Sequence, residues 1–194
     1  MRHKPIKSKL FAQNRKRIAE LMAPKALAVI NANDVLPTNA DGTLPMQPNA
    51  DLFFLTGIEQ EESILVLFPD AADEKHREIL FLRQPNEQLQ IWEGYKHTKA
   101  DARKISGVKN VKWLSEFPVL FRSLMCEAES AYLNSNEYKR ANVEVQTRDM
   151  RFIGQCQSDF PLHQYRRLAP LLHELRVVKT DLEIELLKEA VDIT

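Results

Sequence analysis

Short runs of hydrophobic residues alternate along the chain with longer segments whose hydrophobic residues recur at helical spacing. The apolar runs predict strands at residues 27–30, 63–68, 78–82, 111–113 and 131–133. The second and third runs are apolar almost throughout, which is typical of strands that are covered on both faces of a sheet. The alternation of strands with amphipathic helices therefore predicts an α/β domain with a mixed central sheet and flanking helices.

The amphipathic segments predict helices at residues 8–22, 98–105, 115–125 and about 142–157. Ser8 and Ser115 are predicted to cap two of these helices. Gly107 follows the end of another, at the position that favours a left-handed residue. Ile91 and Trp92 are predicted to form one further short strand.

Residues 31–50 differ in character from the rest of the chain, because Asn, Asp, Pro and Gly crowd this stretch. A loop of this length inside a compact domain is uncommon and is often functional. The loop leads into Asp51–Leu55, which we predict as either a short helix or a short strand, closed by Thr56 and Gly57.

The last predicted helix begins with a clear signal, because Thr180 and Glu183 form the sequence pattern of a capping box. Hydrophobic residues then mark one wide face of this helix, namely Ile184, Leu186, Leu187, Ala190, Val191 and Ile193. Such a face needs a partner layer. We therefore expect the chain to be cut short, with residues 1–175 as one domain and residues 176–194 as the start of a second. In the alternative, this helix docks back on residues 1–170.

Composition and charge argue against several classes of function. The 27 basic and 27 acidic side chains give a formal net charge of zero, which argues against a general affinity for nucleic acid. Arg15, Lys16 and Arg17 form a basic run, but they lie in a helical pattern and are predicted to make a solvated face. No apolar run approaches the roughly 20 residues of a membrane helix. With two cysteines and no signal-peptide pattern, we expect a cytoplasmic protein that binds neither nucleic acid nor a membrane.

The residues supply no catalytic or metal-binding constellation. The five glycines are too far apart for a phosphate-binding loop, and the five histidines form no zinc motif. The acidic residues within 59–62 are predicted to serve loop solubility, and Cys126 is predicted to pack on a helix rather than to act as a nucleophile. We therefore expect no catalytic residue, metal site or cofactor within these 194 residues.

One segment resembles a known family. Residues 47–57 (QPNADLFFLTG) follow the long loop and place two aromatic residues beside polar turn formers. The segment resembles one in the N-terminal domain of proline-specific aminopeptidases (Xaa-Pro aminopeptidase, or aminopeptidase P), which are members of the creatinase and prolidase group. The family pattern reads Arg-Gln-Asn-Ser-Asp-Phe-aromatic-Tyr-hydrophobic-Thr-Gly, and Asn49, Asp51, Thr56 and Gly57 match it.

Further segments resemble the same family in order and with compatible spacing. They are the acidic and hydrophobic run Glu59–Phe68, the Ile-Trp-x-Gly motif Ile91–Gly94, and the segment Leu172–Thr180, which leads into the catalytic domain in the family. The resemblance thus covers residues 25–194. It implies a ribonuclease-H-like arrangement of the mixed sheet for residues 1–175. For residues 176–194 it implies the first helix of a pita-bread catalytic domain.

The resemblance also implies an activity for a full-length enzyme. The family enzyme is a peptidase with two divalent metals, usually manganese, that removes the N-terminal residue preceding proline from a peptide. Its metal ligands lie past residue 194 in the family layout. The domain in this chain would be non-catalytic and would shape the active-site entrance and support a homo-oligomer. The alternatives are a structural or oligomerisation domain of a member that has lost catalysis, and a prolidase- or creatinase-like enzyme.

The residues that the resemblance nominates for the substrate pocket are Asn49, Asp51, Phe53 and Phe54. In the family an aromatic residue of this segment can reach into the pocket of a neighbouring subunit, and Phe53 stands at its position; core packing of Phe53 is the alternative. Phe53 keeps the ring area of the family tryptophan but lacks the indole N–H, and Phe54 lacks the hydroxyl of the family tyrosine. Gln47-Pro48 replaces the family Arg-Gln pair, which removes a charge.

Overall fold

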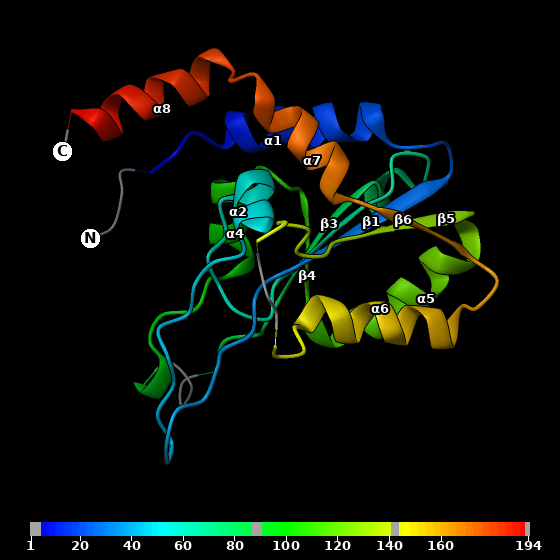
Figure 1. The fold of residues 1–194 in the computed structure, drawn as a ribbon, viewed down its shortest axis with the longest axis horizontal. Coiled ribbons are helices and arrows are strands. Elements are labelled where there is room, and N and C mark those ends of the chain that lie inside the picture. The colour runs from blue at the N-terminus through cyan, green and yellow to red at the C-terminus, as the bar shows by residue number, and fades with distance from the viewer. Residues whose placement is uncertain (1–4, 87–90, 141–143, 193–194) are drawn as a thin grey trace.

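The computed structural model describes residues 5–86, 91–140 and 144–192, and a six-stranded sheet lies at its centre (Figure 1). The strands are β1 (Ala26–Asn31), β2 (Ile64–Leu67), β3 (Glu78–Leu82), β4 (Asn110–Trp113), β5 (Ser130–Leu133) and β6 (Gln164–Arg167). Their order across the sheet is β4-β3-β2-β1-β5-β6. β2 runs antiparallel to β1 and β3, whereas β3/β4, β1/β5 and β5/β6 are parallel pairs. The predicted α/β class and mixed sheet are confirmed.

Helices cover both faces of the sheet (Figure 1). On one face lie α1 (Ser8–Leu21), α2 (Ala50–Thr56), α4 (Lys99–Ser106) and α7 (Ala169–Val177), and on the other lie α5 (Phe117–Glu127) and α6 (Arg148–Asp159). The core divides in the same way. Ile18, Leu55 and Leu172 belong to the cluster on the first face, and Phe121 and Cys156 belong to the cluster on the second. Every residue of β1 is buried, as its near-continuous hydrophobic run predicts.

Two helix starts differ from the sequence prediction. Ser8 lies inside α1, and the preceding Lys7 makes no side-chain cap. Ser115 lies in the 3-10 turn η2 (Leu114–Glu116), so it caps no α-helix. α5 instead begins directly after this turn with Pro118 in its first turn, where the missing N–H of proline removes no helical hydrogen bond. Another 3-10 turn, η1 (Glu74–His76), precedes β3.

The other differences between the predicted and the observed elements lie in polar or exposed segments. The predicted strand at Ile91 and Trp92 is wrong, because residues 91–93 form a helical turn and both side chains are exposed. β6 was not predicted, because it is an edge strand with mostly exposed polar side chains and no apolar run. The helix predicted over about 142–157 begins only at Arg148, where Thr147 caps it; residues 142 and 143 lie outside the described ranges.

The basic run on α1 is not a solvated face. Lys16 is exposed, but Arg15 is fully buried and Arg17 is half-buried. Arg15 donates hydrogen bonds to the backbone carbonyls of Leu55 and Ser106, and Arg17 donates one to the carbonyl of Leu175. These carbonyls lie in the last turns of three other helices, where backbone oxygens lack helical partners and favour a cation. The run was therefore predicted correctly as helical, but the prediction of a solvated face is right only for Lys16.

The C-terminal helix α8 (Asp181–Val191) has the predicted capping box between Thr180 and Glu183. It extends away from the sheet (Figure 1), and its apolar residues Ile184, Leu187 and Val191 are 40%, 51% and 72% exposed. The alternative in which this helix docks back on residues 1–170 is therefore wrong for the described residues, while Ile193 lies outside them. The assignment of residues 176–194 to a second domain stays a prediction. No helix of the described ranges is long and apolar enough to span a bilayer.

Candidate functional site

Asn49 fixes the start of the helix that carries the family-like segment. Its side-chain oxygen accepts hydrogen bonds from the backbone N–H groups of Asp51 and Leu52, both at 3.0 Å. Its side-chain nitrogen donates to the side-chain oxygen of Asn33 in the long loop, also at 3.0 Å. An N-cap of this kind satisfies amides that have no partner inside the helix. The alternative between a short helix and a short strand is therefore decided for a helix, α2.

Asp51 joins two of the family-like segments that are far apart in the sequence. Its carboxylate lies 2.8 Å from the guanidinium of Arg176 on α7 and accepts a hydrogen bond of 2.9 Å from Asn134 after β5. Arg176 also donates to the backbone carbonyl of Ala50 at 2.7 Å and lies 4.6 Å from the centre of the Phe54 ring. Arg176 thus contacts the carboxylate, the backbone and an aromatic ring of the same short helix.

The two phenylalanines of α2 point to different neighbours. Phe53 packs edge-to-face on Phe11 of α1, with ring centres 6.1 Å apart, and Phe54 is held beneath Arg176 and packs against the core. Both rings are half-buried. Of the four nominated residues, Asn49 and Asp51 therefore make polar contacts at the start of α2, whereas the two rings pack within the domain.

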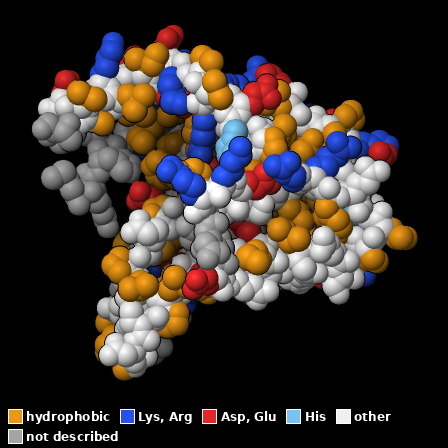
Figure 2. Space-filling view, viewed as in Figure 1, with side chains coloured by type: hydrophobic (Ala, Val, Ile, Leu, Met, Phe, Trp, Pro, Cys, Tyr) orange, Lys and Arg blue, Asp and Glu red, His pale blue; other side chains and the backbone are white. Residues whose placement is uncertain are grey.

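Asn49 and Asp51 line a hollow of about 1330 Å³, whereas neither phenylalanine does. The hollow opens at the carboxyl ends of the parallel strands β1, β5 and β6, where ligand sites of open α/β sheets are commonly found. Its lining includes Asn134 directly after β5, Arg167 at the end of β6 and His173 on α7. In the same view as Figure 1, Lys and Arg side chains gather across the middle of this face (Figure 2). Its lining combines apolar side chains with charges of both signs.

Asp149 is the titratable group in this hollow with the most displaced pKa. Burial raises the pKa of its carboxyl to about 6, although a hydrogen bond from Asn31 and the nearby charge of Arg148 favour the ionised form. The Asn31 bond is 2.9 Å long and joins the end of β1 to the first turn of α6. The side-chain oxygen of Asn31 is buried and has no hydrogen-bond partner within the described residues. This junction is therefore short of one hydrogen-bond donor.

We expect Asp149→Asn to stabilise the protein by about 1–2 kcal/mol at pH 8, with the gain vanishing towards pH 4. Between about pH 4 and 6 the folded state keeps the Asp149 proton while the unfolded state has lost it, so stability falls as pH rises. The asparagine variant removes that loss and offers an N–H to the side-chain oxygen of Asn31. Urea unfolding at several pH values measures the difference. The exposed Asp41→Asn is the matched control, and parallel curves for Asp149→Asn and the parent protein would contradict the expectation.

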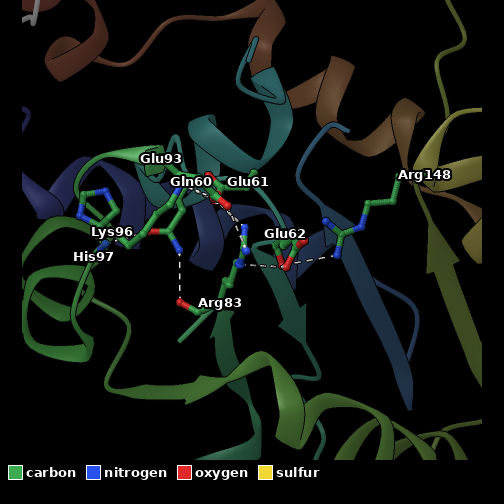
Figure 3. Close-up of polar contacts among 8 residues, drawn as sticks. All are labelled: Gln60, Glu61, Glu62, Arg83, Glu93, Lys96, His97 and Arg148. Atoms are coloured by element: carbon green, nitrogen blue, oxygen red, sulfur yellow. Dashed lines mark hydrogen bonds and ion pairs between the residues drawn. The ribbon is translucent and has the colours of Figure 1, made fainter. Parts of the chain in front are cut away.

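The prediction that the acidic residues at 59–62 serve loop solubility is wrong for Glu61, which joins a second polar cluster, whereas Glu59 and Glu62 are exposed. Glu61 is buried and forms an ion pair of 2.5 Å with Lys96, whose side chain is only 8% exposed. Arg83 adds contacts to Glu61 and to Glu93 at 3.5 and 2.9 Å (Figure 3). Glu93 belongs to the Ile-Trp-x-Gly segment, so this cluster joins two further family-like segments.

The sequence alone did not indicate a role for several residues of these clusters. Asn134, Asp149 and Lys96 stand in no motif, and each acquires its role from a partner that is distant in the sequence. Arg176 had a signal, since it lies in the family-like segment Leu172–Thr180, but its pairing with Asp51 follows only from the fold. Within the described residues, no group of three or more His, Cys, Asp or Glu side chains could hold a metal ion.

A family model for the N-terminal domain of aminopeptidase P matches residues 11–133 of this sequence. The chain belongs to this family. The Xaa-Pro aminopeptidase of Escherichia coli is 28% identical over 185 residues, which are 95% of this chain and 42% of that protein. The mitochondrial intermediate cleaving peptidase 55 of Arabidopsis thaliana is 23% identical over 97% of this chain and 36% of its own length.

Solved structures of aminopeptidase P share the fold. A Bacillus anthracis protein assigned as an aminopeptidase P superposes with a TM-score of 0.83 and 28% identity, over 95% of this chain and 43% of that one. The low-pH form of the Escherichia coli enzyme superposes with a TM-score of 0.74 and 27% identity, over 98% of this chain and 43% of the enzyme. This aminopeptidase P domain thus spans about two fifths of the length of the relatives it matches.

Proposed function

We propose that this aminopeptidase P domain is the non-catalytic N-terminal part of a Xaa-Pro aminopeptidase, a hydrolase that removes the residue preceding proline from the N-terminus of a peptide. The observation that carries the proposal is the similarity to the Escherichia coli Xaa-Pro aminopeptidase along 95% of the chain. The pairing of Asp51 with Arg176 supports it, because two family-like segments meet at one site. The cytoplasm is the proposed location.

The proposed enzyme would use two divalent metals, manganese by preference, held by residues outside this sequence. Paired metals activate a water molecule and polarise the scissile carbonyl. The described side chains of this domain do not fit that role, because they offer no group of three metal ligands. The domain would instead shape the active-site entrance and support a homo-oligomer. The hollow beside Asn49 and Asp51 supports an entrance role, since it gathers polar groups on one face.

The test is a peptidase assay on the longer protein that contains this chain. We expect manganese-dependent release of the first residue from X-Pro-Y peptides and little release from matched X-Ala-Y peptides. The 194-residue chain assayed alone is the control and should be inactive. Hydrolysis of X-Pro dipeptides or of creatine instead would favour a prolidase- or creatinase-like enzyme. Absence of hydrolysis with the metals supplied would favour a structural or oligomerisation domain.

The pocket role of Phe53 is decided in the same assay. Its packing on Phe11 supports a structural role, whereas the position of Phe53 in the family-like segment supports contact with the peptide of a neighbouring subunit. Phe53→Ala in a folded enzyme would raise KM for X-Pro-Y peptides if the ring contacts substrate. Unchanged KM and kcat with a lower melting temperature would assign the ring to packing alone.

A further inference from the structure

Asn31 ends the central strand β1 and forms the buried half of a junction with α6. Its side chain is only 2% exposed, and it points to the face of the sheet that α5 and α6 cover, as Leu27 and Val29 of the same strand do. The side-chain nitrogen of Asn31 donates to a carboxylate oxygen of Asp149, in the first turn of α6, at 2.9 Å. These two side chains therefore join the centre of the sheet to one of its covering helices.

This junction has one hydrogen-bond acceptor too many. The side-chain oxygen of Asn31 is buried and has no hydrogen-bond partner within the described residues. An ionised Asp149 carboxylate has acceptors only, so it cannot supply the missing donor. A protonated carboxyl can, because its O–H donates while its other oxygen accepts. A primary amide and a carboxylic acid are complementary in this way, since each offers a donor and an acceptor side by side.

The surroundings of Asp149 favour the proton-bound form. Burial raises the pKa of its carboxyl to about 6, and the negative charges of Asp51 on α2 and Asp34 in the loop after β1 act in the same direction. Arg148, its neighbour on α6, acts in the opposite direction. The next cation on this helix, Arg151, is paired with Asp34 at 2.6 Å. The carboxyl therefore stays neutral at pH values at which an ordinary aspartate is ionised.

We propose that Asn31 and Asp149 form a clasp between β1 and α6 that closes when Asp149 takes up one proton from solvent. In the proton-bound form the carboxyl donates its O–H to the Asn31 oxygen and still accepts the Asn31 N–H, so two hydrogen bonds join the helix to the sheet. In the ionised form one bond remains, and the Asn31 oxygen has no donor. Because the first turn of α6 lines the hollow beside Asn49, the clasp holds one wall of that hollow more tightly at low pH. The clasp does not rest on the proposed peptidase activity and can be tested without it.

The test is amide hydrogen exchange by NMR in the 194-residue chain at about pH 5 and about pH 7.5, corrected for the intrinsic exchange rate of each amide. The decisive probe is the amide of Arg151, whose hydrogen bond of 3.1 Å to the carbonyl of Thr147 breaks when the first turn of α6 opens. Opening returns the pKa of Asp149 from about 6 to about 4, so we expect the protection of this amide to be about tenfold greater at the lower pH. The amide of Ala102, which makes the same bond to Thr98 in α4, is the internal reference.

Two variants separate the clasp from burial of the carboxyl alone. Asp149→Asn carries a permanent donor, so the Arg151 amide should keep at about pH 7.5 the protection that the parent protein shows at about pH 5. Asn31→Ala removes two hydrogen bonds from the proton-bound form, but from the ionised form it removes one bond together with an oxygen that lacks a donor. This variant should therefore lower protection mainly at the lower pH and reduce the tenfold ratio to about threefold or less.

The matched control is Asp159→Asn, which neutralises an exposed carboxylate on the same helix and should leave the ratio unchanged. A ratio near one in the parent protein, or the full tenfold ratio in a folded Asn31→Ala protein, would overturn the proposal. If Asn31→Ala also loses protection at Ala102, the fold as a whole has opened, and Asp149→Asn then decides the question. Protection of its Arg151 amide at about pH 7.5 that is no greater than in the parent at that pH would equally overturn the proposal.

Discussion

Replacing Arg15 by methionine is expected to lower the free energy of unfolding by about 3–5 kcal/mol, because it removes one partner of a buried polar network. The guanidinium donates to the carbonyls of Leu55 and Ser106 at 2.8 and 2.9 Å and to the carboxylate of Glu78 at 3.1 Å. The methionine would leave two helix-end carbonyls without these donors and Glu78 without its cation. Urea unfolding followed by far-UV circular dichroism measures the loss.

Two further variants separate the causes of this loss. Lys16→Met changes the neighbouring, exposed cation and should shift stability by less than about 0.5 kcal/mol. Arg15→Lys keeps the charge but loses the planar guanidinium that reaches several acceptors. Its loss in free energy of unfolding should therefore lie between the losses for Arg15→Met and Lys16→Met. Equal losses for Arg15→Met and Lys16→Met would mean that the carbonyl contacts of Arg15 carry no stability.

The sheet was predictable because strands that are buried on both faces need hydrophobic residues at nearly every position. β1, β2 and β3 are buried on both faces, so their near-continuous hydrophobic runs stand out from the sequence. β6 gives no such signal, because it is an edge strand with exposed arginine side chains. Charged side chains at the edge of a sheet discourage pairing with other chains. The predictable part of the fold is therefore the part in which burial dictates residue type.

The polar contacts could not be predicted in the same way. A buried arginine such as Arg15 and a solvated lysine such as Lys16 belong to one basic run, and only the ends of α2 and α4 distinguish them. The resemblance nominated Asp51 and included Arg176, yet it could not show that they pair. Neither the segment that contains Asp51 nor the segment that contains Arg176 indicates which residue it pairs with. Such pairs depend on how the elements pack, which the hydrophobic pattern determines only indirectly.

Gly57 sits where α2 ends against α1, and we expect Gly57→Ala to destabilise the protein by about 2–4 kcal/mol. Gly57 has a φ of 69°, a left-handed conformation that costs an alanine about 1–2 kcal/mol. A Cβ at this position would also lie 2.4 Å from the Phe11 ring, and such overpacking adds about 1–3 kcal/mol. Thermal and urea unfolding measure the total.

Gly107 supplies the control that divides this cost, since it ends α4 with a similar φ of 74° and its added Cβ would approach Ser8 no closer than 3.6 Å. Gly107→Ala should therefore show the left-handed cost of about 1–2 kcal/mol alone. Adding Phe11→Leu should recover at least about 1 kcal/mol of the Gly57→Ala loss, as a positive coupling in a double-mutant cycle. Equal losses of stability at the two glycines, together with no coupling, would show that the Phe11 ring moves aside at little cost in free energy. Coupling would show that the contact between Phe11 and Gly57 fixes how α2 ends on α1, and with it the placement of Phe53 and Asp51.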